Sequence, residues 1–284
     1  MIFAASAQLL NDAVANNYIV GAFNVFNAES IRAVVKAADA AGVPVIVSVG
    51  EPDLNFMGAD AVAALTEVEA EKVDIPVGLH LDHGTSLGSV VRCIQAGFSS
   101  VMIDASDISE EEGIAVVKQT VNLCHAVGVS VESMVGSLRL ATEDEDGVGE
   151  GGTREELTDP EKAEVFVRRT GIDALAVSVG TEHGSFLVGK SPEIDMVRLA
   201  EISRRVDIPL VVHGGSAICD AQLKETREHR VGKINIGSAL RVAFRDALVD
   251  AFKEPRIDAR EALKRAEDAM RQVVSDRIAK LSLT

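Results

Sequence analysis

Short apolar runs alternate with longer amphipathic segments along nearly the whole chain. Most of the short runs are continuously apolar, as strands buried on both faces of a parallel sheet require. The expected strands are Tyr18–Phe23, Pro44–Val49, Pro76–Leu81, Ser99–Ile103, Val129–Glu132, Ala174–Val177, Pro209–Val212 and Val231–Ile234. The clearest helical patterns between them are Ser30–Ala41, Asp60–Glu69, Glu110–Ala126, Pro192–Val206 and Ala239–Phe252.

Eightfold strand–helix alternation predicts an α/β protein, a (β/α)8 or TIM barrel that forms one domain over residues 1–284. Ser6–Asn16 is expected to be a capping helix ahead of the first strand. Residues 254–284 are expected to form a helical extension of the same domain, with a long charged helix over Asp258–Leu281. A doubly wound open sheet is the alternative, but no G-x-G-x-x-G motif follows the first strand.

Polar residues gather at the predicted strand ends, which is where barrels of this kind place their active sites. They are Asn24, Asp82–His83, Asp104–Ser106, Glu132, Glu182–Gly184, His213–Ser216 and Asn235–Ser238. Because the carboxyl ends of parallel barrel strands share one rim, these side chains are expected to converge.

Three of the six histidines, His83, His183 and His213, fall at separate strand ends. Imidazole nitrogens suit Zn²⁺ and similar ions, and three protein ligands with an open position describe a catalytic metal site. The alternative interpretation is three hydrogen-bonded rim residues without a metal. His80 is expected in the core or behind the ligands, whereas His125 and His229 are assigned no role.

Two glycine-containing segments, HGGS at His213–Ser216 and NIGS at Asn235–Ser238, each lead from a strand into a helix. Backbone N–H groups at helix starts bind anions, and this corner is the usual phosphate site of such barrels. Glycine in a tight strand–helix turn is the alternative explanation. We also expect the Gly- and acid-rich segment Gly136–Thr153 to be a lid or binding loop.

The composition narrows the class of ligand and partner. The 284 residues carry a net charge of −16, with a pI near 4.8. That balance argues against nucleic acid and anionic membranes, because there is no basic surface to release counterions. No apolar run reaches the ~20 residues of a membrane span. The three scattered cysteines are expected to be reduced thiols in a cytoplasmic protein.

Six strings together resemble the class II, metal-dependent ketose-bisphosphate aldolases, which act on fructose or tagatose bisphosphate. They are GAFNVFN, LHLDHGTS, GFSSVMIDAS, GIDALAVSVGTEHG, IPLVVHGGS and KINIGSALR. The resemblance covers nearly the whole chain. It implies reversible cleavage of a phosphorylated ketose, a 1,6-bisphosphate or a related sugar, to dihydroxyacetone phosphate and an aldehyde through a zinc-stabilised enediolate.

The resemblance also implies roles for individual residues. His83, His183 and His213 would bind Zn²⁺, with Co²⁺ as an alternative metal. A monovalent cation is a candidate for a second, separate cofactor. Asp82 would exchange a proton with the C4 hydroxyl, and Glu145 would move the enediolate proton. The expected substrate-binding residues are Asn24, Gly184, Gly214, Gly215, Ser216, Asn235, Gly237 and Ser238.

The stretch Asp258–Met270 resembles the family pattern D-P-R-x-x-L-x-x-A-x-x-A-M, with Ala259 in place of proline. By the resemblance, Arg260 would reach the distal phosphate in a neighbouring subunit, so a homodimer or homotetramer is expected. An ordinary solvated helix charge is the alternative.

The chain departs from the family pattern mostly on the side expected to bind the aldehyde. Met134 replaces a second glutamate, Ser137–Thr142 replaces a Gly-Gly segment, and Gly50-Glu51 stands where Ser or Thr is usual. Ala217 and Gly237 also differ. We interpret the chain as a relative with altered sugar specificity. The alternatives are a standard fructose-bisphosphate aldolase and a sugar-phosphate-binding barrel with lost or changed chemistry. A Schiff-base enzyme is disfavoured because Lys233 lies inside a strand, short of the rim.

Overall fold

The computed structural model describes residues 3–106, 108–137, 157–184 and 189–282. Eight parallel strands follow one another around a closed barrel, and β1 pairs with both β2 and β8. The strands are β1 Val20–Asn24, β2 Val45–Gly50, β3 Val77–Gly84, β4 Ser100–Ile103, β5 Ser130–Val135, β6 Ala174–Val177, β7 Leu210–Val212 and β8 Val231–Ile236. The predicted barrel is therefore confirmed, and the open sheet is excluded.

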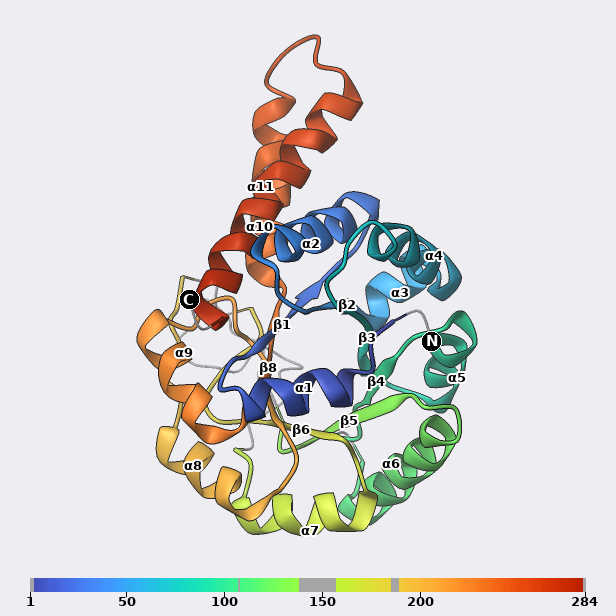
Figure 1. The fold of residues 1–284 in the computed structure, drawn as a ribbon, viewed down its shortest axis with the longest axis vertical. Helices are drawn as coiled ribbons and strands as arrows, with labels where there is room; N and C mark the ends of the chain where they lie inside the picture. The colour runs from blue at the N-terminus through green and yellow to red at the C-terminus, as the bar shows by residue number, and fades with distance from the viewer. Residues whose placement is uncertain (1–2, 107, 138–156, 185–188, 283–284) are drawn as a thin grey trace.

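Helices surround the strands as an outer ring, which Figure 1 shows in a view along the barrel. They are α2 Ala28–Ala41, α3 Glu51–Met57, α4 Ala59–Ala70, α5 Leu87–Ala96, α6 Glu110–His125, α7 Pro160–Thr170, α8 Met196–Arg205, α9 Asp220–Thr226, the 3-10 turn η1 Arg227–His229 and α10 Ser238–Ala251. None of the helices in the described ranges is long and apolar enough to cross a membrane.

Helix α1 (Ser6–Ala15) lies across the end of the barrel where the strands begin (Figure 1). The Ala4 N–H donates to the Val77 carbonyl at 2.9 Å, and the Ala7 N–H donates to Ser130 Oγ at 3.0 Å. Val77 and Ser130 each begin a strand, so α1 covers the N-terminal mouth. The C-terminal mouth is left for the site.

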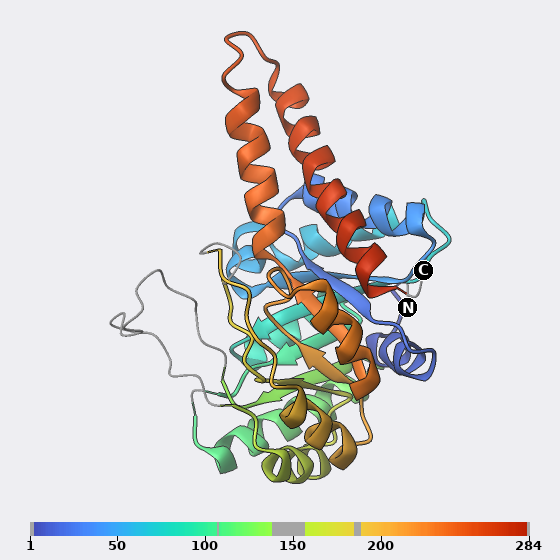
Figure 2. The same ribbon diagram turned by 90° about the vertical axis from the view of Figure 1, so that its left-hand side faces the viewer.

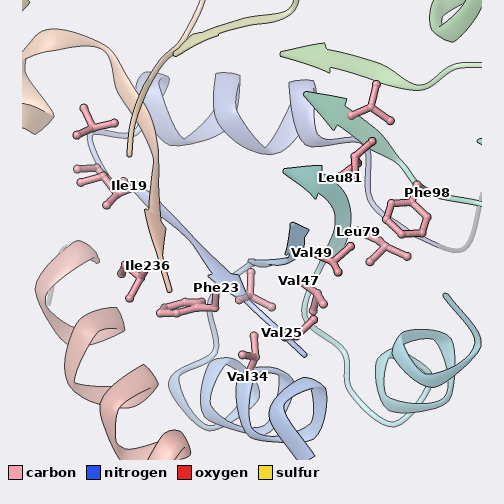
Figure 3. Close-up of a cluster of buried hydrophobic side chains, with 14 of the residues drawn as sticks. Ile19, Phe23, Val25, Val34, Val47, Val49, Leu79, Leu81, Phe98 and Ile236 are labelled. Atoms are coloured by element: carbon pink, nitrogen blue, oxygen red, sulfur yellow. The ribbon is translucent and has the colours of Figure 1, made fainter. Parts of the chain in front are cut away.

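Alternation along the strands separates two buried layers. Phe23, Leu79 and Leu81 point outward into the main core between strands and helices (Figure 3). Ala22 and Ile46 point inward and pack with the other apolar residues of the barrel interior. Because successive side chains of a strand face opposite ways, His80 and Asp82 point inward beside them.

Helix α10 and the long helix α11 (Ala259–Leu281) form a hairpin that projects beyond the barrel (Figures 1 and 2). The C-terminal half of α11 runs back to the wall of the barrel. The buried apolar residues of α11 follow a helical spacing: Ala262, Ala266, Met270, Val274, Ile278 and Leu281. They bury one stripe of the helix, largely against α2 and α10. The expected capping helix and C-terminal extension are both present.

Candidate active site

Three imidazoles meet at the C-terminal mouth of the barrel. His83 comes from the end of β3, His183 from the segment after β6, and His213 directly follows β7. Their ring centroids lie 4.8 Å (His83–His213), 5.1 Å (His83–His183) and 5.8 Å (His183–His213) apart. One nitrogen from each ring lies within 4.8 Å of the others. All three line a cavity of about 1020 Å³.

A break in the β3 geometry presents two neighbouring residues to this cavity. In a regular strand, Asp82 and His83 would face opposite sides. His83 instead has φ +50°, a left-handed conformation that non-glycine residues rarely adopt. The pairing of β3 with β4 shifts register between Leu81 and Gly84 at the same place. Such local irregularities next to active sites re-aim side chains, and here the carboxylate and the imidazole face the same space.

Buried or half-buried carboxylates hold the outer nitrogens of two rings. Asp104 Oδ2 lies 2.7 Å from His83 Nδ1, and Glu132 Oε1 lies 3.2 Å from His213 Nε2. The remaining nitrogens, His83 Nε2 and His213 Nδ1, face each other at 3.1 Å. Ligand nitrogens at ~2.0–2.1 Å from a tetrahedral ion would be about 3.3 Å apart. The donor set therefore fits a divalent metal, with its outer nitrogens anchored by carboxylates.

The electrostatics of the three rings differ. Burial, and next the neighbouring His83, lower the pKa of His183 to about 3. Burial also lowers the pKa of His213. Burial opposes protonation of His83 as well, but the hydrogen bond to Asp104 and the nearby carboxylates outweigh it and raise its pKa. Neutral imidazole is the form that binds a metal, so His183 and His213 are already in the binding state.

Asp82 sits beside the triad with both oxygens engaged. The Asn24 side-chain amide donates to Oδ2 at 2.7 Å, and the Asn235 amide donates to Oδ1 at 3.1 Å. Burial alone would raise the pKa of Asp82, but His83, His213 and Lys233 outweigh it and hold the pKa well below its usual range. Asp82 is thus an oriented, ionised carboxylate that lines the cavity.

The loops after β7 and β8 meet in a corner next to the triad that has the features of an anion-binding site, and we call it the anion-binding corner. The Gly237 and Ala239 N–H groups both donate to Ser216 Oγ at 3.3 Å, at the start of α10. Gly214 has φ +71°, and a Cβ there would lie 2.7 Å from the Glu182 carbonyl oxygen. Oriented N–H groups at a helix start favour a phosphate.

Neighbouring parts of the chain fix the shape of this corner. Arg277 of α11 donates to the Ser216 carbonyl, and also to that of Ile218 at 3.2 Å. A Cβ on Gly237 would lie 2.9 Å from Asn24 Oδ1. The departure from the family pattern at Gly237 therefore leaves room for the amide that orients Asp82.

The structure brings most of the predicted site residues together and places two, Gly215 and Arg260, elsewhere. Those that line the cavity are Asn24, Asp82, His83, His183, Gly184, His213, Gly214, Ser216, Asn235, Gly237 and Ser238. Gly215 lies behind the lining, where a Cβ would meet Ile234 Cγ2 at 2.2 Å. Arg260 is 91% exposed near the hairpin tip, where it pairs with Asp258. Glu145 lies outside the described residues.

Met134 does not line the cavity that holds the triad, contrary to the expectation that it lies on the aldehyde side of the rim. It is buried in the barrel interior beside Met102 and borders a separate cavity of about 210 Å³. Gly50, in contrast, does line the main cavity. The reason is strand alternation. Met134 comes two residues after Glu132 in β5, so both side chains point to the inside of the barrel.

Sequence reasoning missed the buried pair that supports His213. Lys233 Nζ lies 2.6 Å from Glu132 Oε2 and 3.2 Å from His80 Nε2, and the lysine side chain is only 1% exposed. His80 Nδ1 in turn lies 2.7 Å from Ser100 Oγ. The sequence did offer one indication of this buried group: His80, Glu132 and Lys233 are polar residues within otherwise apolar strands. His80 lies behind the ligands as expected.

Comparisons with known proteins agree with this geometry. Residues 4–283 match the family described as class II fructose-bisphosphate aldolase. The chain belongs to that family of aldolases, and its members are typically metal-dependent.

Solved structures of three aldolases or putative aldolases are similar to this chain over nearly its whole length. The YdjI aldolase from Escherichia coli K12 is 29% identical with a TM-score of 0.84, and the match covers 99% of this chain and 97% of that one. A putative fructose-1,6-bisphosphate aldolase from Coccidioides immitis is 25% identical with a TM-score of 0.83, covering 98% and 96%. The fructose-bisphosphate aldolase of Campylobacter jejuni is 22% identical with a TM-score of 0.79, covering 96% and 93%, and shows the shared fold.

Replacing Asp104 by asparagine tests the anchoring of the triad. Asp104→Asn removes the charged acceptor of His83 Nδ1, so we expect zinc affinity to fall by ~10–100-fold, as when supporting partners of metal ligands are lost. Zinc titration against a competing chromogenic chelator measures it. The matched control is Asp173→Asn, which alters another Asp–His pair, with His125 at 2.9 Å. Unchanged zinc affinity in Asp104→Asn would contradict the anchoring role.

Proposed function

We propose that the protein is a metal-dependent lyase that reversibly cleaves a phosphorylated ketose to dihydroxyacetone phosphate and an aldehyde. The observation that carries the proposal is the ionised Asp82 carboxylate held beside the His83, His183 and His213 nitrogens in one cavity. The anion-binding corner at the start of α10 opens into the same cavity. Membership of the class II aldolase family supports the same chemistry.

His83, His183 and His213 would hold Zn²⁺, for which Co²⁺ is the expected substitute. When bound there, a divalent cation supplies Lewis-acid stabilisation of the negative charge that develops as the carbon–carbon bond breaks. The corner formed by Gly214, Ser216 and the α10 start would hold the phosphate of the dihydroxyacetone half.

Asp82 would accept the proton of the C4 hydroxyl during cleavage and return it to the aldehyde oxygen in the reverse direction. The amides of Asn24 and Asn235 keep the carboxylate aimed at the reacting centre. Among the described residues, Asn235 Oδ1 is a buried acceptor without a hydrogen-bond partner, so it is free to accept from a substrate hydroxyl. The proton transfer at the dihydroxyacetone carbon remains assigned to Glu145 as a proposal.

The geometry disfavours a Schiff-base mechanism. Lys233 is the lysine nearest the site along β8, yet its ammonium group is enclosed by Glu132 and His80 inside the barrel. It does not line the cavity that the triad lines. A barrel that only binds sugar phosphates requires no proton acceptor. Asp82, ionised and oriented by two amides beside the triad, is placed as such an acceptor, which favours catalysis.

Turnover assays with and without metal test the proposal. Cleavage of phosphorylated ketoses should stop in excess chelator and return on adding Zn²⁺. Asp82→Asn should keep zinc content and phosphate affinity while kcat falls by ~10²–10⁴-fold, because only proton transfer is lost. Turnover in chelator by metal-free protein would refute the proposal. Loss of zinc in Asp82→Asn equal to the loss of activity would make Asp82 structural.

We also propose that the protein is a homodimer or homotetramer that associates through the α10–α11 hairpin. Val249 and Phe252 of α10 are 56% and 60% exposed, although both are large and apolar. They border a mostly apolar hollow with Phe26, Phe244 and Leu248. A hairpin that projects from the barrel with such a face would be covered by a second copy. Arg260, near the tip, would then lie close to the neighbouring molecule.

Light scattering after size exclusion tests the association. The wild-type chain should have the mass of two or four copies, and Val249→Asp with Phe252→Asp should shift it toward one copy because charge at the contact is left desolvated. Val197→Asp on α8 is the control, since Val197 is 73% exposed and far along the chain from the hairpin. A monomeric wild-type chain at micromolar concentration would contradict the proposal.

A further inference from the structure

The lining of the cavity contains two chemically different regions. One is the anion-binding corner, formed by Gly214, Ser216 and the start of α10, and the other, which we call the α3 end, is formed by the first turn of α3. The lining residues of α3 and its surroundings are Glu51, Pro52, Asp53, Asn55 and Thr85. The described ends of β4 and β5 border the separate, smaller cavity instead. A ligand whose phosphate occupies the α10 corner therefore extends past the triad toward α3.

A fixed carboxylate stands at the α3 end. Glu51 Oε2 accepts from the Thr85 N–H at 2.8 Å, and Oε1 accepts from the Ser89 hydroxyl. Burial alone would raise the pKa of Glu51, but the hydrogen bonds from Ser89 and Thr85 outweigh it and lower the pKa. The carboxylate also lies at the N-terminal turn of α5, where a negative charge is stabilised. Glu51 is thus ionised and held in place.

Two arginines lie near this carboxylate. Arg92 Nη2 lies 4.0 Å from Glu51 Oε1, but Arg92 does not line the cavity, whereas Arg241 does. Arg241 of α10 pairs with Asp53 of α3 and lies over the Phe26 ring, 5.0 Å from its centroid. Among the described lining residues, Arg241 is the sole lysine or arginine. With Asp53 neutralising Arg241, Glu51 gives the lining of the α3 end a net negative charge, which Arg92 offsets only from outside the lining. Among the described lining residues at that end, no guanidinium or ammonium group is left unpaired to hold a phosphate.

We propose that the substrate is a ketose 1-phosphate whose far end is an uncharged, hydroxylated chain, and that Glu51 is the residue that sets this preference. The inference rests on the proposed aldolase function and names the substrate class. A carboxylate only accepts hydrogen bonds, so it pairs with sugar hydroxyls. A second phosphate at that end would instead meet Glu51 as a like charge, and like charges across an interface select against the wrong ligand.

Steady-state kinetics with zinc-loaded protein tests the inference. The probes are D-fructose 1,6-bisphosphate, D-fructose 1-phosphate and D-tagatose 1-phosphate. We expect kcat/KM to be at least ~10-fold higher for a monophosphate than for the bisphosphate. Glu51→Gln keeps the size of the side chain and removes its charge. It should lower kcat/KM for the monophosphates and raise it for the bisphosphate, so that their ratio falls by ~10-fold or more.

The control for net charge is Glu201→Gln, an exposed α8 residue outside the cavity, which should leave the ratio unchanged. Wild-type preference for the bisphosphate, unaltered by Glu51→Gln, would overturn the inference while leaving the aldolase function standing. If Arg260→Ala then removed that preference, a second copy would supply the missing cation. Failure to cleave any of the ketoses, together with failure to exchange the dihydroxyacetone phosphate proton, would overturn the proposed function itself.

Discussion

The site depends on two carboxylates that turn two imidazoles toward the same point. Asp104 fixes His83 from the outside of the rim, and Glu132 fixes His213 from inside the barrel. Without these anchors, each ring would be free to rotate, and the 3.1 Å approach of His83 Nε2 to His213 Nδ1 would have nothing to maintain it. Because such partners set which nitrogen carries the proton, they also decide which nitrogen is presented to a metal.

Other parts of the fold support these anchors. Lys233 balances the Glu132 charge inside the barrel, where an unpaired carboxylate would be strongly destabilising. Helix α1 closes the N-terminal mouth of the barrel beneath that pair. The Ser6 hydroxyl donates a hydrogen bond to Ser100 Oγ, which is also hydrogen-bonded to His80. On the far side, α11 holds the loop after β7 through Arg277. Helix α11 therefore contacts the loop of the anion-binding corner and also forms part of the hairpin proposed for association.

The sequence was sufficient to predict the barrel and the convergence of the three histidines because both follow from local pattern. Continuous apolar runs located the strands, and the polar residues just beyond them had to share one rim. Side-chain direction past a strand end was not predictable, since it depends on single backbone angles such as φ at His83. The same limit explains Met134: β5 continues to Val135, three residues past the predicted end, and carries Met134 into the interior. Pairings between distant strands, such as Glu132 with Lys233, require the closed barrel before they can be recognised.

The central claim is that His83, His183 and His213 bind one divalent metal through the nitrogens that their partners leave free. A crystal of the zinc-loaded protein, measured on both sides of the zinc absorption edge, tests it most directly. The account predicts one anomalous peak per chain, ~2.0–2.1 Å from His83 Nε2, His213 Nδ1 and a His183 nitrogen. A peak at another place, or no peak in protein shown to be active, would contradict it.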